Sequence, residues 1–314
     1  MTTTSKHSIS VVGFIVTLVG AVLFSTKAVI VKLAFVSTHA NALTLLTLRM
    51  LFSLPFYLVA AFVVSSRSSN VKLNNKEWSI VLGLGVIGYY LSSLFDFIGL
   101  QYISAGLERL ILFLYPTFAV FINAYFFKQT ISGVQRVALT LTYAGIALAY
   151  FGELALDSSN PNFYYGSFMV FLCAVTYAIY IVGSGKIIPR IGSAKFTAYA
   201  MLVATGGIFA HFAVAGETAT FQMGKELWIY GILLAVVATV IPSFMLSYGL
   251  KSIGSNNVAI ISGIGPVSTI MQAYFILGER IVVEQIIGTA LVIAGVVLIG
   301  WKRKPAAVVE EVAA

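Results

Sequence analysis

Long apolar stretches, separated by short polar segments, make up almost the whole chain. The polar segments are rich in Asn, Gly, Ser and Pro, which are typical of the turns between helices. Ten of the apolar stretches approach the ~20 residues that a helix needs to cross a bilayer. We therefore predict an all-α integral membrane protein with ten membrane-spanning helices, at residues 11–35, 41–64, 79–101, 104–127, 133–152, 164–185, 194–215, 227–249, 255–277 and 282–301.

The second half of the chain repeats the first. Residues 99–151 align without a gap with residues 249–301, which lie 150 positions further on, and Pro116 corresponds to Pro266. Each half holds five predicted helices, and this odd number reverses the direction of the second copy. Inverted repeats are typical of membrane transporters, whose substrate site lies between the halves. The predicted units are a first five-helix repeat at 1–156, a second five-helix repeat at 157–302 and a cytoplasmic tail at 303–314.

The composition also indicates a bilayer as the main solvent. Hydrophobic residues make up 59% of the chain and charged residues 10%, whereas soluble domains carry about 25% charged residues. The single cysteine, Cys173, excludes a disulfide framework and a cysteine metal cluster. The sequence contains no phosphate-binding loop, no zinc-binding histidine pair and no nucleophilic serine elbow. We therefore expect no enzyme, no bound metal or cofactor, and no nucleic-acid partner.

The distribution of Lys and Arg predicts the orientation. With a cytoplasmic N-terminus, thirteen of these residues fall in inner segments, whereas the outer loops hold only Lys225 and Arg280. Positively charged residues accumulate on the cytoplasmic side of membrane proteins. We predict a multi-pass protein of the plasma (inner) membrane with both termini in the cytoplasm.

Charged residues inside the predicted spans point to a functional site. A charge at the centre of a membrane helix costs at least ~2.5–3.5 kcal/mol, so it usually faces a cavity or a partner. The six ionisable residues within the spans are Lys27, Lys32, Arg49, Asp96, Glu108 and Arg109. Lys32 lies near a helix end, where snorkelling to the headgroups is an alternative. The positions that correspond to the other five in the second half are uncharged. We predict a polar site built mainly by the first four spans, with a positive surplus that favours an anionic ligand.

The candidate substrate-binding residues are Lys27, Arg49, Asp96, Glu108, Arg109, Tyr115 and Asn256. We expect Lys27 and Arg49 to attract the anionic group, and Asp96 and Glu108 to balance charge or carry a coupling proton. Tyr115 and Asn256 are expected to be neutral contacts. Two structural interpretations stay open: an Arg49–Asp96 bridge between helices, and an interfacial pair formed by Glu108 and Arg109.

Proline and glycine indicate where helices bend. Pro116 and Pro266 are expected in equivalent mid-helix positions, where each removes an intrahelical hydrogen bond. Interruptions at corresponding positions of two repeats are typical of a transporter's site. The predicted gating residues are Pro116, Gly263, Gly265 and Pro266; structural kinks without ligand contact are the alternative. Small residues in the spans 133–152 and 282–301 predict a close helix contact, within the chain or in a homodimer.

Several segments carry a family resemblance. Residues 24–28 read Phe-Ser-Thr-Lys-Ala, residues 102–109 read Tyr-Ile-Ser-Ala-Gly-Leu-Glu-Arg, and residues 277–280 read Leu-Gly-Glu-Arg. Together they resemble the EamA-type family of the drug/metabolite transporter superfamily, over about residues 11–301. The first copy departs from the last motif, since it reads Phe127-Lys128-Gln129-Thr130. The resemblance implies ten helices in two inverted repeats, a central cavity, and alternating-access transport of small metabolites, often as efflux.

We therefore expect a secondary transporter that moves a small polar or anionic, amino-acid-like metabolite across the plasma membrane by alternating access, as efflux. Its expected partners are a small-molecule substrate and the lipid bilayer, while proton coupling and a homodimer stay open. A second interpretation is an uptake or exchange carrier for a vitamin or a nucleotide-like cofactor. A third is a membrane sensor that transports nothing, and a fourth is a membrane enzyme with Asp96 and Glu108 as its carboxylates.

Overall fold

The computed structural model describes residues 11–67, 71–128, 130–156, 159–216 and 224–301. Within these ranges every regular element is a helix, which confirms the all-α prediction. The elements in chain order are α1 (Val11–Thr38), α2 (Ala42–Ser65), α3 (Asn75–Gly85), the π-helical η1 (Val86–Leu91), α4 (Ser92–Leu100), α5 (Ala105–Leu112), α6 (Tyr115–Phe127), α7 (Gly133–Leu156), α8 (Phe163–Ile191), α9 (Ser193–Ala215), α10 (Lys225–Ala235), the π-helical η3 (Val236–Val240), α11 (Ile241–Ser262), α12 (Gly265–Gln272), the π-helical η4 (Ala273–Leu277) and α13 (Val283–Trp301).

The surface of the bundle suits a lipid environment. Among the described residues, eight helical segments are long and apolar enough to cross a membrane: Val11–Thr38, Ala42–Ser65, Asn75–Leu100, Ala105–Phe126, Gly133–Leu156, Phe163–Ile191, Ser193–Ala215 and Lys225–Leu246. Large apolar side chains point outwards, and Phe62, Phe126 and Phe275 are 73%, 70% and 72% exposed. An apolar surface of this extent is stable in lipid and not in water. The protein is therefore an integral membrane protein, as predicted.

Side-chain caps determine where several helices begin. Asn41 accepts the N–H of Thr44 at 2.8 Å at the start of α2. Asn74 and Glu77 form a reciprocal capping box at the start of α3, with both hydrogen bonds at 2.9 Å. Ser104 caps α5 by accepting the N–H of Leu107. These caps satisfy backbone N–H groups that have no acceptor within the helix.

Two predicted helix boundaries are wrong. Helix α8 continues to Ile191, beyond its predicted end at residue 185. Helix α11 continues through 250–254, where we predicted a connection between two spans. In the first copy the chain leaves the helix and Ser104 caps a new one, but the equivalent residue of the second copy is Gly254. Glycine has no side-chain oxygen, so the hydrogen bond by which Ser104 caps the new helix in the first copy cannot form at Gly254.

The two prolines lie in the first turn of a helix and not in mid-helix, which corrects the prediction. Pro116 follows a break at Phe113–Leu114 and lies in the first turn of α6. Pro266 follows the equivalent break at Gly263–Ile264 and lies in the first turn of α12. First-turn N–H groups have no intrahelical acceptor, so proline costs little there. The discontinuity in each copy is therefore the turn that precedes the proline.

The small residues of α7 and α13 are used within the chain. A Cβ atom on Gly145 of α7 would lie 2.5 Å from the carbonyl oxygen of Gly288 in α13. Backbones approach this closely only where side chains are absent, as in other membrane helix pairs. The close contact predicted from the sequence therefore joins the last helices of the two halves. Ala290 and Ala294 on the other side of α13 are exposed, and a homodimer contact stays a prediction.

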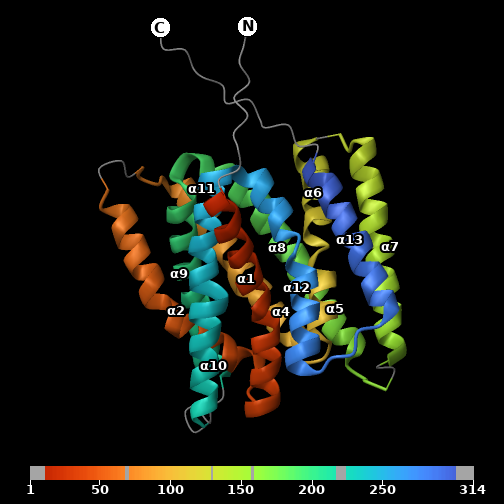
Figure 1. Cartoon of the computed structure of the whole chain (residues 1–314). Coiled ribbons are helices and arrows are strands. Elements are labelled where there is room, and N and C mark those ends of the chain that lie inside the picture. The colour runs from red at the N-terminus through yellow and green to blue at the C-terminus, as the bar shows by residue number, and fades with distance from the viewer. Residues whose placement is uncertain (1–10, 68–70, 129, 157–158, 217–223, 302–314) are drawn as a thin grey trace, which may run out of the picture.

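Helix α1 lies at the centre of the bundle, where it packs against α11, α12, α10 and α5. In Figure 1 the first residues of α1 and the last residues of α13 lie at the same end of the bundle. Lys27, near the middle of α1, is thereby surrounded by helices from both halves of the chain.

Candidate functional site

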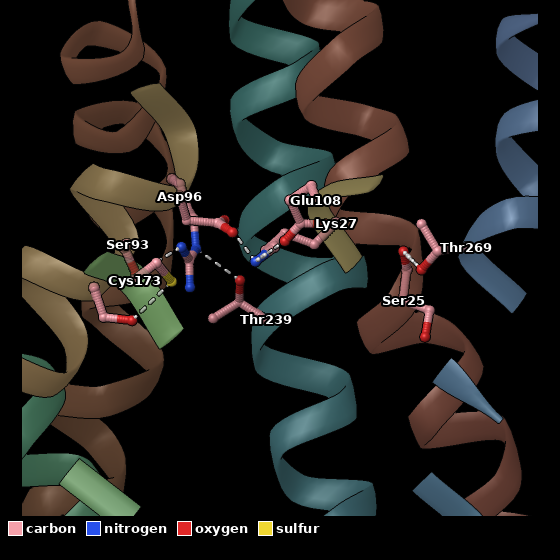
Figure 2. A network of polar contacts seen from close by, with 10 residues as sticks. Ser25, Lys27, Ser93, Asp96, Glu108, Cys173, Thr239 and Thr269 are labelled. Atoms are coloured by element: carbon pink, nitrogen blue, oxygen red, sulfur yellow. Dashed lines mark hydrogen bonds and ion pairs between the residues drawn. The ribbon is translucent and has the colours of Figure 1, made fainter. Parts of the chain in front are cut away.

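One lysine and two carboxylates meet at the centre of the bundle. The Nζ atom of Lys27 in α1 lies 2.6 Å from Oδ2 of Asp96 in α4. The same atom lies 3.8 Å from Oε1 of Glu108 in α5. The three residues are 8%, 1% and 0% exposed. Figure 2 shows Lys27 between the two carboxylates. Buried charges are stable only when they are paired, so this cluster explains how three charged residues are accommodated inside the membrane.

Neither the hydrogen bonding nor the charge of this cluster is complete. Among the described residues, Asp96 Oδ1 and both side-chain oxygens of Glu108 have no hydrogen-bond partner. One ammonium group also faces two carboxylates, so the cluster is one positive charge short when both acids are ionised. A proton or the cationic group of a ligand can supply that charge.

Arg49 of α2 is held by neutral groups. Its Nε donates to Oγ1 of Thr239 at 3.0 Å, and its Nη1 lies 3.4 Å from Oγ of Ser93. The guanidinium lies over the ring of Phe97, 5.6 Å from the centroid. In the part of the chain that the structure describes, Arg49 forms no ion pair. The interpretation of an Arg49–Asp96 bridge is therefore wrong, because Asp96 pairs with Lys27.

Arg109 of α5 has a similar environment. Its Nη2 donates to Oγ of Ser25 at 3.2 Å, and its guanidinium lies 5.9 Å and 5.8 Å from the ring centroids of Phe24 and Phe113. Its Nε has no hydrogen-bond partner and the residue forms no ion pair within the described ranges. An interfacial Glu108–Arg109 pair is thus not formed, since Glu108 turns to Lys27.

A cavity of about 360 Å³ brings most of these residues together. Sites for small molecules commonly occupy ~300–1,000 Å³. The predicted site residues that line it are Lys27, Arg49, Asp96, Arg109 and Tyr115. Glu108 lies behind this wall in contact with Lys27. The side chain of Asn256 lies outside the described residues, so its contact with a substrate stays a prediction.

The predicted gating residues do not line this cavity within the described ranges. Gly265 nevertheless contacts the site indirectly, because a Cβ atom on it would lie 3.0 Å from Nη2 of Arg109. Gly263 and Pro266 are buried near the same turn, and Pro116 lies at the start of α6. Their roles in gating stay predictions.

Both halves contribute to an aromatic wall of this cavity, of which the sequence analysis identified Tyr115 but not Tyr57, Tyr177 and Tyr180. Tyr115 and Tyr177 lie edge to face at 5.0 Å, and Tyr89 and Tyr180 do so at 4.8 Å with their hydroxyl groups 3.1 Å apart. With Tyr57, these side chains line the cavity. The spacing of Tyr177 and Tyr180 in α8 places both on one helix face, and this was the available signal.

The second half also supplies neutral polar groups. Thr239 of η3 and Ser243 of α11 line the cavity, and the hydroxyl groups of Ser243 and Tyr57 are 3.4 Å apart. The Thr239 hydroxyl also donates to the carbonyl of Leu234 at 2.8 Å, as expected where a π-helical turn leaves that carbonyl available. The first half thus carries the charges, while hydroxyl and aromatic groups come from both halves.

Comparison with known proteins identifies the class. A model of the EamA-like transporter family matches the chain twice, over residues 11–151 and 164–301. The chain therefore belongs to the EamA-like transporter family and is a multi-pass membrane transporter, as the sequence resemblance indicated. Transporters of this family are generally not enzymes.

Individual relatives agree with this assignment. The uncharacterized transporter YcbK of Bacillus subtilis (strain 168) is 31% identical over 292 residues, which cover 90% of this chain and 91% of that protein. The uncharacterized inner membrane transporter YicL of Salmonella typhimurium is 21% identical, over 91% of this chain and 94% of that protein. A crystal structure with 16% sequence identity superposes with a TM-score of 0.64, over 94% of this chain and 98% of the other, and shows the fold alone.

Proposed function

We propose that this protein is a secondary transporter of the plasma membrane that moves a small polar or anionic metabolite by alternating access. The supporting observation is that Arg49 and Arg109 both line the central cavity and, among the described residues, form no ion pair. Guanidinium groups bind carboxylate and phosphate through two parallel hydrogen bonds. An anionic group entering this cavity would gain such bonds without having to break an existing ion pair.

The pairing of Lys27 changes the roles that we expected for the charged residues. Arg49 and Arg109 become the proposed anion-binding pair, because Lys27 is held by two carboxylates. An amino-acid-like substrate fits this arrangement, since its ammonium group could bind the Asp96 carboxylate, which lines the cavity, while an arginine holds its carboxylate. With no substrate bound, a proton on Asp96 or Glu108 would balance the cluster. We therefore propose proton coupling through these two carboxylates.

Inverted repeats would allow the site to open on either side. We propose ten spans in two oppositely oriented halves with both termini in the cytoplasm. The two family matches and the closely packed α7 and α13 support this arrangement. The cavity wall reaches Ile188, Ser193 and Thr197 at the α8–α9 connection, which the distribution of charges assigns to the cytoplasm. We propose that the cavity opens to the cytoplasm at this connection, as an exporter requires for loading.

The aromatic wall favours a second candidate. Five tyrosines and two phenylalanines line the cavity: Tyr57, Tyr89, Tyr115, Tyr177, Tyr180, Phe24 and Phe113. Aromatic side chains stack favourably on planar rings. Uptake or exchange of a vitamin or a nucleotide-like cofactor is therefore the alternative function.

Flux measurements in proteoliposomes test both candidates. Vesicles with the protein and vesicles without it would be loaded with a mixture of amino acids, organic acids, vitamins and nucleotides, and the released solutes would be identified by mass spectrometry. The variants Arg49→Gln and Arg109→Gln should each reduce flux of the released anion at least tenfold. Arg136→Gln is the matched control, because Arg136 is exposed on α7 and does not line the cavity.

Two results would contradict the proposal. Unchanged flux in both cavity variants would remove the arginines from the binding site. Specific binding of a solute without any movement across the vesicle membrane would instead support a sensor.

A further inference from the structure

The first turn of α5 is hydrogen-bonded to the second half of the chain. The N–H of Ala105 donates to Oε1 of Glu279 at 2.9 Å, and the N–H of Gly106 lies 3.4 Å from Oε2 of the same carboxylate. Glu279 belongs to the connection between η4 and α13. Neither the predicted binding residues nor the predicted gating residues include it.

This contact completes the hydrogen bonding of the helix start. The N–H of Ser104 donates to Oε1 of Glu153 at 3.2 Å, and the N–H of Leu107 donates to Oγ of Ser104 at 3.0 Å. The first N–H groups of a helix have no acceptor within it, and leaving them unsatisfied inside a membrane is costly. Glu279 satisfies two of them, and its negative charge also interacts favourably with the positive end of the helix dipole.

The contact lies at the end of the bundle opposite to the α8–α9 connection, which the cavity reaches. The Nδ2 group of Asn160, just before α8, donates to the carbonyl of Tyr102 at 2.8 Å, so α8 begins beside the start of α5. The cavity reaches Ile188 near the other end of α8. Within the described ranges, no cavity-lining residue comes from 98–108 or 276–283. The Glu279 contact therefore belongs to the closed end.

The sequence of the first copy differs at this point. Gly278 and Lys128 are equivalent and both have positive φ values, 70° and 51°. The residue after Lys128 is Gln129, which stands where the second copy has Glu279 and lies outside the described residues. Only one copy therefore has a charged acceptor at this position.

We propose that Glu279 is a latch that holds the closed end of the transport cavity, and that its two hydrogen bonds to α5 break when this end opens. Because α5 also carries Glu108 and Arg109, the latch positions both residues and couples their placement to the state of the closed end. This inference rests on the proposed function, since opening at this end serves a transporter.

Cysteine accessibility in the purified protein tests the latch without a substrate. Ile270 is 8% exposed in α12, and its Cγ1 would lie 3.4 Å from a Cβ atom on Gly106. In a Cys173→Ala background, an Ile270→Cys substitution reports opening through its rate of reaction with a water-soluble maleimide. Glu279→Gln should raise that rate about tenfold, while Glu279→Asp, which keeps the charge, should raise it less. Glu284→Gln, an exposed glutamate of the next helix, is the matched control and should leave the rate unchanged.

A second variant breaks the same contact from the other side. Ala105→Pro removes the N–H that binds Oε1 of Glu279, at the first position of a helix where proline is well tolerated. The preceding Ser104 has φ −64° and ψ 156°, which suits a residue before proline. This variant should accelerate labelling of Ile270→Cys to a similar extent.

A general loss of stability would give a different result. Ala200 of α9 is fully buried in another part of the bundle, and an Ala200→Cys probe should stay slow in every variant. An unchanged Ile270→Cys rate, or equal acceleration of both probes, would overturn the latch. Selective acceleration in a protein that moves no solute would instead support the latch and contradict the proposed transport.

Discussion

Replacing Lys27 by methionine removes the single cation of the central cluster while keeping most of the side-chain volume. The Nζ–Oδ2 distance to Asp96 is 2.6 Å, and the Nζ–Oε1 distance to Glu108 is 3.8 Å. At an effective dielectric constant of about 20, these separations correspond to about 6 and about 4 kcal/mol of Coulomb attraction. Most of this attraction is offset by the cost of burying the ammonium group.

The Lys27→Met variant should still lose much of its unfolding free energy. Removing one partner of a buried ion pair typically costs about 3–5 kcal/mol, because a charge is left buried without compensation. Asp96 and Glu108 are almost fully buried, so we expect a loss of stability within this range for Lys27→Met, about 3–5 kcal/mol. The double variant Lys27→Met/Asp96→Asn should lose less unfolding free energy than the two single variants lose together. We expect the difference to be about 1–3 kcal/mol.

Unfolding of the purified protein in mild detergent measures these differences. Lys76→Met is the matched control, since Lys76 is exposed at the start of α3 and should have no effect. A Lys27→Met variant as stable as this control, or strictly additive single and double variants, would refute the assigned cluster. The result also matters for function, because reduced flux in a Lys27 variant would reflect the loss of a structural ion pair as well as any lost substrate contact.

Three further predictions concern packing, capping and selectivity. Gly145→Leu should lower the free energy of unfolding by about 1–3 kcal/mol, because its side chain would clash with the Gly288 backbone. Ser104→Ala should cost about 1 kcal/mol, since it removes the acceptor of the Leu107 N–H. Tyr177→Leu should reduce proteoliposome flux of a ring-containing substrate several-fold and leave that of a ring-free substrate of equal charge unchanged.

Thermal or denaturant unfolding checks the first two of these, with Ala290→Ser on the exposed side of α13 and Ser79→Ala on the exposed side of α3 as controls. Wild-type stability in either Gly145→Leu or Ser104→Ala would contradict the corresponding contact. Equal loss of flux for both substrates in Tyr177→Leu would mean that the aromatic wall shapes the cavity without selecting rings.

The sequence was sufficient to predict most of the helices and the residue types of the site. Apolar stretches of membrane-spanning length can hardly be anything other than helices in lipid, because every backbone polar group must be satisfied internally. It also indicated that Lys27, Arg49, Asp96 and Arg109 would share a cavity, because isolated charges are too costly in a membrane. Failures occurred where the outcome depended on a local turn, as at residues 250–254 and at the break before Pro116.

Only the tertiary structure decided which charges pair. The sequence suggested a bridge between Asp96 and Arg49, whereas the packing of α1, α2 and α4 pairs Asp96 with Lys27. The same packing leaves Arg49 and Arg109 with neutral partners. It also places Glu279 at the start of α5, next to Gly106, which is 173 residues away in the sequence. The sequence by itself determined that this is an apolar bundle with a few costly charges, since that depends on composition along each helix. The partners of those charges depend on how separate helices rotate and pack, which local sequence does not encode.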